Sequence, residues 1–201
     1  ILFDAVHDAM LERLKARGGF VVEGANKARL QRAIWEDGEQ INPRIVAQPA
    51  QFIADYAGFE IPEDTRFFIV PETGYGPDHK FSGEKMTVTM ALYRARDIDE
   101  AIALTNGIQA YQGQGHSCGI YSTSEANIMK LAEGTKTSRV MVNQPQAPSN
   151  SGNLWNGMRQ TFSLGCGSWG GNGTNNNITW RDLINETWGG VRINIDRNYL
   201  D

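Results

Sequence analysis

Cysteine and histidine are scarce in this chain, and the few thiols and imidazoles lie far apart in the sequence. Among 201 residues there are two cysteines, Cys118 and Cys166, and three histidines. Neither cysteine belongs to a Cys-x-x-Cys pair or to a cysteine–histidine cluster with the spacing of a zinc site. The sequence therefore argues against a disulfide framework and against a bound metal ion.

Clustered positive charge and long apolar runs are also missing. The formal net charge is −4, and no stretch concentrates lysine or arginine, so a nucleic acid is not expected as a partner. No apolar segment reaches the length of a membrane span, and no basic start followed by an apolar stretch suggests a secretory signal. These absences predict a cytoplasmic protein without a membrane partner.

The two ends of the chain suggest a piece of a larger assembly. Ile1 is not a start methionine, and the apolar residues 1–3 have the character of the end of a buried strand. We therefore expect one domain over residues 1–185, truncated at its N-terminus, and a separate tail over residues 186–201. In that tail Val191, Ile193 and Ile195 alternate with polar residues, which is typical of a strand that needs a partner elsewhere.

Hydrophobic periodicity changes along the chain from helical to alternating. It predicts helices over residues 4–17, 26–36 and 49–56, and strands over 66–72, 86–95, 117–122 and 139–143. Two further helices are predicted to begin at Asp97 and Ser122, and to end at Asn106-Gly107 and Gly134. The alternation after residue 86 predicts an α/β fold with a mainly parallel, doubly wound sheet. Ligands in such sheets bind where the loops at one edge meet.

Glycine and asparagine crowd one stretch, Ser163 to Asn177, with the sequence SLGCGSWGGNGTNNN. These residues are favoured where the backbone adopts positive φ or where another group comes close. Leu164, Cys166 and Trp169 supply apolar anchors, so we expect a shaped loop rather than a flexible linker. The whole tract over residues 144–177 is longer than an ordinary connection, which indicates a functional role.

Five segments, in this order, resemble the CoA-acylating aldehyde dehydrogenases. They are FDAVHDAM near the start, IVAQPAQFIADYAGFEIPEDT from Ile45, GEKMTVTMALYRARDIDEAI from Gly83, GQGHSCGIYS from Gly113 and LGCGSWGGN from Leu164. That family includes acetaldehyde, propionaldehyde and sulfoacetaldehyde dehydrogenases and the aldehyde half of bifunctional aldehyde-alcohol dehydrogenases. The resemblance implies an aldehyde dehydrogenase-like catalytic domain, and a C-terminal oligomerisation strand that makes a homo-oligomer.

The resemblance also implies a reaction. A thiolate attacks a short aldehyde, hydride passes to NAD or NADP, and coenzyme A releases the acyl group. In the family the nucleophilic cysteine precedes the strand that leads into the FDAVHDAM-like helix, so it is expected upstream of Ile1. Cys118 and Cys166 match other positions, and neither has a histidine or an acid at a telling spacing. We therefore expect no nucleophile in this chain, and no activity from the chain alone.

Two candidate site residues follow from matched motifs. Glu84 in GEKM matches the family's glutamate that accepts hydrogen bonds from the nicotinamide ribose hydroxyls. Thr87-Val88 stands where the family usually has Ser-Pro or Gly-Pro, so the loop shape is expected to differ. His116 matches a Gly-His pair at the start of a strand, where it could donate to a substrate or cofactor oxygen, or cap the strand end.

Two more candidates concern the aldehyde. Arg159 lies in NGMRQTF, the segment that lines the aldehyde pocket in the resembling fold. A guanidinium there would favour an acidic aldehyde, such as sulfoacetaldehyde or succinate semialdehyde, over acetaldehyde. The alternative is a surface arginine or an ion pair at a subunit interface. Phe162, with Trp155 and Trp169, is expected to wall the pocket and anchor the loop.

Two other functions fit the same residues. One is a non-catalytic binding module whose tract over residues 144–177 holds a polar or phosphorylated ligand, such as a sugar or the pyrophosphate of coenzyme A. The other is a pseudoenzyme kept for assembly. If the protein is the enzyme, the resemblance implies that it could lie within a bacterial enzyme assembly in the cytoplasm.

Overall fold

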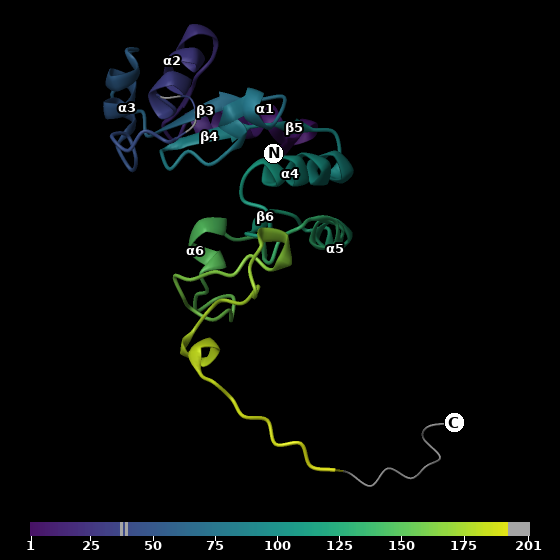
Figure 1. The fold of residues 1–201 in the computed structure, drawn as a ribbon. Coiled ribbons are helices and arrows are strands. Elements are labelled where there is room, and N and C mark those ends of the chain that lie inside the picture. The colour runs from purple at the N-terminus through teal and green to yellow at the C-terminus, as the bar shows by residue number, and fades with distance from the viewer. Residues whose placement is uncertain (37, 39, 193–201) are drawn as a thin grey trace.

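The computed structural model describes residues 1–36, 38 and 40–192, in which short parallel strands alternate with helices (Figure 1). The strands are β1 (Leu2–Phe3), β2 (Gly19–Val21), β3 (Phe67–Pro71), β4 (Thr89–Leu92), β5 (Arg94–Ala95), β6 (Cys118–Ile120) and β7 (Val140–Val142). The α-helices are α1 (Asp4–Lys15), α2 (Gly24–Ile34), α3 (Ala50–Ala57), α4 (Ile98–Tyr111), α5 (Glu125–Gly134) and α6 (Gln146–Asn150). Three 3-10 helices complete the order: η1 (Pro77–Ser82), η2 (Ser168–Gly170) and η3 (Trp180–Leu183).

All pairings between these strands are parallel, which confirms the α/β fold class. They form three separate ladders, with the orders β2-β3-β4, β1-β5 and β6-β7, rather than one continuous sheet. Only Tyr93 separates β4 from β5, so the chain passes directly from the first ladder to the second. The predicted strand over residues 86–95 is thus shorter and interrupted, and Met86 lies outside it with a positive φ of 47°.

The N-terminal part, residues 1–97, is held together by apolar packing. Its helices α2 and α3 cover β2, β3 and β4, and Trp35 meets Phe81 edge-on with ring centroids 5.4 Å apart. The side chains of this core are Val22, Leu30, Ile34, Trp35, Ile45, Ala50, Ile53, Ala54, Phe59, Phe68, Val70 and Phe81. Each large side chain buried in this way stabilises the fold by about 1.5–3 kcal/mol.

The strand β2 was missed by the sequence prediction, which used Gly18-Gly19 only as the end of a helix. Gly18, with φ of 90°, does end the turn after α1, but Gly19 opens β2 and pairs with Phe67 of β3. A side chain at Gly19 would overlap Ile69, because the two strands and the end of α1 pack closely there. The glycine therefore serves both the helix end and the close packing of the strand.

The C-terminal part, residues 112–192, contains β6, β7, α5 and α6, and α4 lies between it and the N-terminal part (Figure 1). The prediction that this helix ends at Asn106-Gly107 was wrong, since α4 continues to Tyr111. Gly107 is present because a side chain there would overlap the ring of Tyr75. Asn106 instead ties α4 to the end of α5, donating to the Gly134 carbonyl at 2.7 Å.

The start of α5 also differs from the prediction by two residues. Ser124, not Ser122, is the N-cap, and its hydroxyl accepts from the Asn127 amide at 3.3 Å. The Ser122 hydroxyl accepts from the Ser124 amide at 3.0 Å, so it shapes the turn before the helix. Both serines could cap the helix, and the spacing of Ser122 and Glu125 matches a capping box, which is why the sequence favoured Ser122.

After η3 the chain runs away from the rest of the molecule (Figure 1). Val191 and Trp188 are almost fully exposed, at 86% and 89%. Ile193 and Ile195, the other members of the expected strand, lie outside the described residues, so that expectation stays a prediction. Within the described residues, no helix is long and apolar enough to cross a membrane.

Candidate functional site

Two of the candidate site residues lie in loops that lead into strands. Glu84 lies between η1 and β4, and His116 lies just ahead of β6. A third residue, Arg139, stands in the same position ahead of β7. Because β6 and β7 are parallel neighbours, the loops before them share one edge of their ladder.

The loop of Glu84 is anchored by backbone contacts that leave its carboxylate in solvent. The Glu84 amide donates to Gln112 Oε1 at 2.8 Å, and a side chain at Gly83 would overlap the same amide group. The ammonium group of Lys85 donates to the carbonyls of Phe81 and Gly83, at 2.7 and 2.6 Å. Burial lowers the pKa of Lys85 to about 8, and the negative charge of Glu84 acts in the opposite direction. The exposed Glu84 carboxylate is thus presented on a fixed turn.

His116 lies four residues after Gln112, in the turn that Glu84 contacts. Its ring is exposed, and Nδ1 lies 2.8 Å from the Ser117 hydroxyl. Its backbone carbonyl accepts from Nη1 of Arg139 at 3.2 Å. The position fits both a hydrogen-bond donor to a ligand and a cap of β6.

The stretch over residues 163–177 is a shaped loop, as predicted. Its two ends pair as an antiparallel bridge between Leu164 and Asn177, and the Gly167 amide donates to the Thr174 carbonyl at 2.9 Å. A side chain at Gly115 would overlap the carbonyl of Cys166, so the loop packs directly on the turn before β6. Leu164 and Cys166 are half-buried, whereas Trp169 is 45% exposed and anchors the loop less.

Arg139 holds this loop against the rest of the C-terminal part. The residue is 5% exposed, and its guanidinium donates five hydrogen bonds within the protein. The acceptors are the Asn177 side-chain oxygen and the carbonyls of His116, Gly165, Asn175 and Asn176, at 2.6–3.2 Å. Burial lowers the pKa of Arg139. The sequence prediction treated Arg139 only as the start of a strand, although a guanidinium beside a buried strand needs many acceptors.

A chain of side-chain amides extends from Arg139 to the segment of Arg159. The Asn177 Nδ2 group donates to the carbonyls of Asn150 and Arg159, at 3.0 and 2.8 Å. The Asn150 side chain in turn donates to the Ser117 hydroxyl at 3.1 Å. The backbone of Arg159 is therefore fixed through Asn177 to the same guanidinium that holds the loop.

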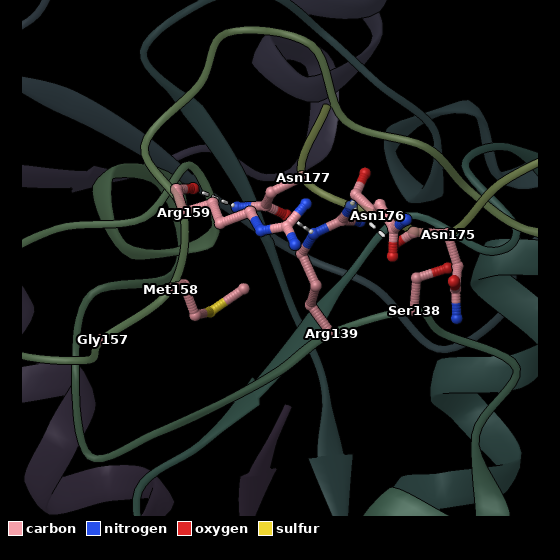
Figure 2. Close-up of a pocket in the computed structure, with 8 residues that line it drawn as sticks. All are labelled: Ser138, Arg139, Gly157, Met158, Arg159, Asn175, Asn176 and Asn177. Carbon is pink, nitrogen blue, oxygen red and sulfur yellow. Dashed lines mark hydrogen bonds between the residues drawn. The ribbon is translucent and has the colours of Figure 1, made fainter. Parts of the chain in front are cut away.

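A shallow surface pocket of about 400 Å³, called the cavity below, lies beside this network and is largely open to solvent (Figure 2). Its lining is polar and comes from three segments: Ser138 and Arg139, then Gly157, Met158 and Arg159, then Asn175, Asn176 and Asn177. The Arg159 side chain is half exposed, and Nη1 lies 3.5 Å from a carboxylate oxygen of Asp182. The Ser138 hydroxyl oxygen is buried and has no hydrogen-bond partner in the protein. The cavity therefore presents the guanidinium of Arg159 to a small polar ligand.

Phe162, Trp155 and Trp169 do not line this cavity. Phe162 is fully exposed, and Trp155 is 70% exposed. Their expected role as walls of an aldehyde pocket stays a prediction.

Neither thiol is placed as a nucleophile in the cavity. Cys118 is buried in β6, with Sγ 3.7 and 3.6 Å from the hydroxyls of Thr135 and Thr137. Cys166 is half-buried within the loop, and it is not among the residues that line the cavity. Among the described residues, no group of three or more histidine, cysteine, aspartate or glutamate side chains could hold a metal ion.

Comparisons with known proteins agree with this fold. No protein-family model matches the chain. The chain is 36% identical over 189 residues to the acylating sulfoacetaldehyde dehydrogenase of Bilophila wadsworthia, covering 92% of this chain and 41% of that protein. It is 34% identical over 190 residues to the bifunctional aldehyde-alcohol dehydrogenase of Escherichia coli K12, covering 92% and 21%.

A solved structure of an acetylating aldehyde dehydrogenase also matches the chain. The chain matches the acetylating aldehyde dehydrogenase of Geobacillus thermoglucosidasius with a TM-score of 0.88 and 28% identity, over 97% of this chain and 44% of that one. The fold is that of an aldehyde dehydrogenase-like α/β protein. The chain belongs to the CoA-acylating aldehyde dehydrogenase family. It spans about two fifths of the length of the sulfoacetaldehyde dehydrogenases that it matches.

Proposed function

We propose that this chain is the aldehyde-binding part of a CoA-acylating aldehyde dehydrogenase that oxidises a short, acidic aldehyde with NAD or NADP. The observation that carries the proposal is the polar cavity lined in part by the end of the glycine-rich loop, where the Arg159 side chain is half exposed. A guanidinium at that place can bind a sulfonate or a carboxylate with two parallel hydrogen bonds. The named activity of the Bilophila wadsworthia relative, on a sulfonated aldehyde, supports this choice of substrate.

The nicotinamide cofactor binds beside the Glu84 loop. The exposed carboxylate of Glu84 accepts hydrogen bonds from the two ribose hydroxyls of the nicotinamide nucleotide, because an ionised carboxylate is an acceptor only. His116, between Glu84 and the cavity, donates to the oxygen of the aldehyde or of the cofactor. NAD or NADP takes up hydride when bound, and coenzyme A accepts the acyl group as co-substrate.

The attacking thiolate comes from a residue outside positions 1–201. Cys118 is enclosed by hydroxyls in the core, and Cys166 is packed inside its loop. The 201 residues alone therefore bind the aldehyde's acidic group and do not oxidise it. In the whole protein, residues 1–185 form the catalytic unit, within a doubly wound sheet that other segments complete. The tail over residues 186–201 pairs with a second copy in a cytoplasmic homo-oligomer.

The test uses a chimeric subunit, in which these residues replace the matched segment of the Bilophila wadsworthia protein. We expect NADH formation with sulfoacetaldehyde and coenzyme A, and a lower kcat/KM with acetaldehyde. Arg159→Ala should raise KM for sulfoacetaldehyde about 10- to 100-fold, which corresponds to one lost charged hydrogen-bonding contact, and should leave acetaldehyde unchanged. Steady-state kinetics followed by NADH absorbance gives both values.

Arg181→Ala is the matched control, since the guanidinium of Arg181 lies over the ring of Trp180 at 5.3 Å and outside the cavity. If Arg159→Ala raises KM equally for sulfoacetaldehyde and acetaldehyde, the proposed preference for an acidic aldehyde is wrong. If the chimera folds but shows no CoA-dependent aldehyde oxidation, the proposed enzymatic function is wrong. If that inactive chimera binds a polar ligand, the non-catalytic binding module is favoured.

A further inference from the structure

We propose that the buried positive charge of Arg139 contributes to the selection of anions at this cavity. All of its N–H groups are used to position the loop, so the charge acts without a hydrogen bond to the ligand. The inference rests on the proposed function, because it concerns the same cavity. It differs from that function in assigning part of the selectivity to a residue that does not touch the ligand.

The hydrogen-bonding capacity of Arg139 is used up within the protein. A guanidinium has five N–H donors, and five donated hydrogen bonds from Nε, Nη1 and Nη2 are described above. The acceptors are neutral carbonyl and amide oxygens. Arg139 can therefore hold the backbone of Gly165, Asn175 and Asn176 in place, but it has no donor left for a ligand.

The charge of Arg139 is not matched by its hydrogen-bond partners. Within residues 1–36, 38 and 40–192, no carboxylate forms an ion pair with Arg139. Neutral acceptors satisfy the N–H groups, but they do not cancel the positive potential of a cation that is 5% exposed. That potential extends into the adjacent cavity, which Arg139 lines.

The charges around the cavity add up to a positive site. Arg139 and Arg159 line it, and Asp182 is the carboxylate that pairs with Arg159. Hydrogen bonding from the Thr179 amide lowers the pKa of Asp182, so this carboxylate is ionised at neutral pH. Two guanidiniums against one carboxylate leave one positive charge for a ligand to neutralise.

Charge and hydrogen bonding at Arg139 can be separated by substitution. The probes are ethanesulfonate and its neutral counterpart ethyl methyl sulfone, titrated into the 201-residue chain while amide chemical shifts around the cavity are followed by NMR. Arg139→Lys keeps the charge and loses most of the hydrogen bonds, whereas Arg139→Gln loses the charge. Arg32→Gln, on the exposed surface of α2, controls for net charge.

We expect the unmodified chain to bind ethanesulfonate more tightly than the sulfone. Arg139→Gln should reduce that preference on the order of tenfold, since one charge a few ångströms away is removed from a partly buried site. Arg139→Lys should keep the preference within about threefold. If Arg139→Gln does not fold, Asn175→Asp replaces it, because it adds a carboxylate among the residues that line the cavity and leaves the Asn175 carbonyl to accept from Arg139. It should abolish the preference as well.

Retention of the anion preference in Arg139→Gln or in Asn175→Asp would overturn the inference, and so would its complete loss in Arg139→Lys. If Arg159→Gln loses the preference while Arg139→Gln retains it, the inference fails and the proposed function stands. If the unmodified chain shows no preference for the anion, both the inference and the acidic substrate fail.

Discussion

The two parts of this chain are stabilised in different ways. In the N-terminal part, residues 1–97, twelve buried apolar side chains form one packed cluster. In the C-terminal part, residues 112–192, buried apolar residues are few, and Arg139, Ser117, Asn150 and Asn177 form a hydrogen-bonded network in their place. Apolar packing stabilises a fold without fixing directions, whereas hydrogen bonds fix the position of each group. The part that shapes the cavity is the part held by directional contacts.

The largest effect on global stability should come from the apolar cluster. Phe68 is fully buried between helices α2 and α3 and the strands. Phe68→Ala should lower the free energy of unfolding by about 3–5 kcal/mol, since it leaves a cavity in a packed core. Urea unfolding of the chain measures the change. Phe162→Ala is the control, because Phe162 is fully exposed and its loss should cost less than about 0.5 kcal/mol. A similar loss from both variants would contradict the comparison.

The next effect should be local to the C-terminal part. Asn177→Ala removes one acceptor and two donors that connect Arg139 to Asn150 and Arg159. Leaving the guanidinium with one unmet donor should cost about 2–3 kcal/mol within the loop. Hydrogen exchange of the Gly165 and Gly167 amides should therefore become about 30- to 160-fold faster.

Asn175→Ala is the matched control for that substitution, because the Asn175 carbonyl, not its side chain, accepts from Arg139. Exchange in the N-terminal strands β2 and β3 should not change in either variant. If Asn177→Ala accelerates exchange throughout the chain, the loop is not a separately held unit, and the contrast between the two parts is lost.

The smallest effect should be a pH dependence from Lys85. Its pKa in the folded protein is about 8, below that of an ordinary lysine, because burial disfavours the charged form. The unfolded chain then binds more protons than the folded chain between about pH 8 and pH 10, so stability should rise with pH in that window. Tyr93, whose pKa is raised to about 12 mainly by burial, has the opposite effect only above about pH 10.

Lys85→Met should remove most of the rise, which we expect to be on the order of 2 kcal/mol. Chemical unfolding at a series of pH values, with Tyr93→Phe as the control, measures it. A rise of unchanged size in Lys85→Met would show that the ammonium group is not buried on the turn of Glu84, and would weaken the assignment of that turn as a fixed platform.

Periodic patterns predicted the fold well where one structural requirement dominates. The helices over residues 4–17, 26–36 and 49–56 and the strand over 66–72 are found within a few residues of their predicted bounds. Prediction failed where one residue serves two purposes. Gly107 resembles a helix end but makes room for Tyr75, and Gly19 both follows a helix and opens β2.

The site was only partly predictable from the sequence. Motifs indicated Glu84, His116 and Arg159, and the structure joins their loops through Gln112 and Arg139. Gln112 and Arg139 were missed because most of their partners are backbone groups far away in the sequence. Gln112 accepts from the Glu84 amide, and Arg139 donates mainly to carbonyls. A carbonyl is present at every position, so no sequence pattern distinguishes the ones that Arg139 contacts.

The central claim is that this chain binds the aldehyde while the attacking thiol belongs to another segment. The most direct measurement is to mix the chimeric subunit with sulfoacetaldehyde and NAD without coenzyme A, quench it rapidly, and locate the acyl group by peptide mass spectrometry. Attack by the thiolate and transfer of hydride to NAD would leave one acyl thioester for each NADH formed. We expect the acyl group on a cysteine outside the 201 residues. An acyl group on Cys118 or Cys166 would contradict the claim.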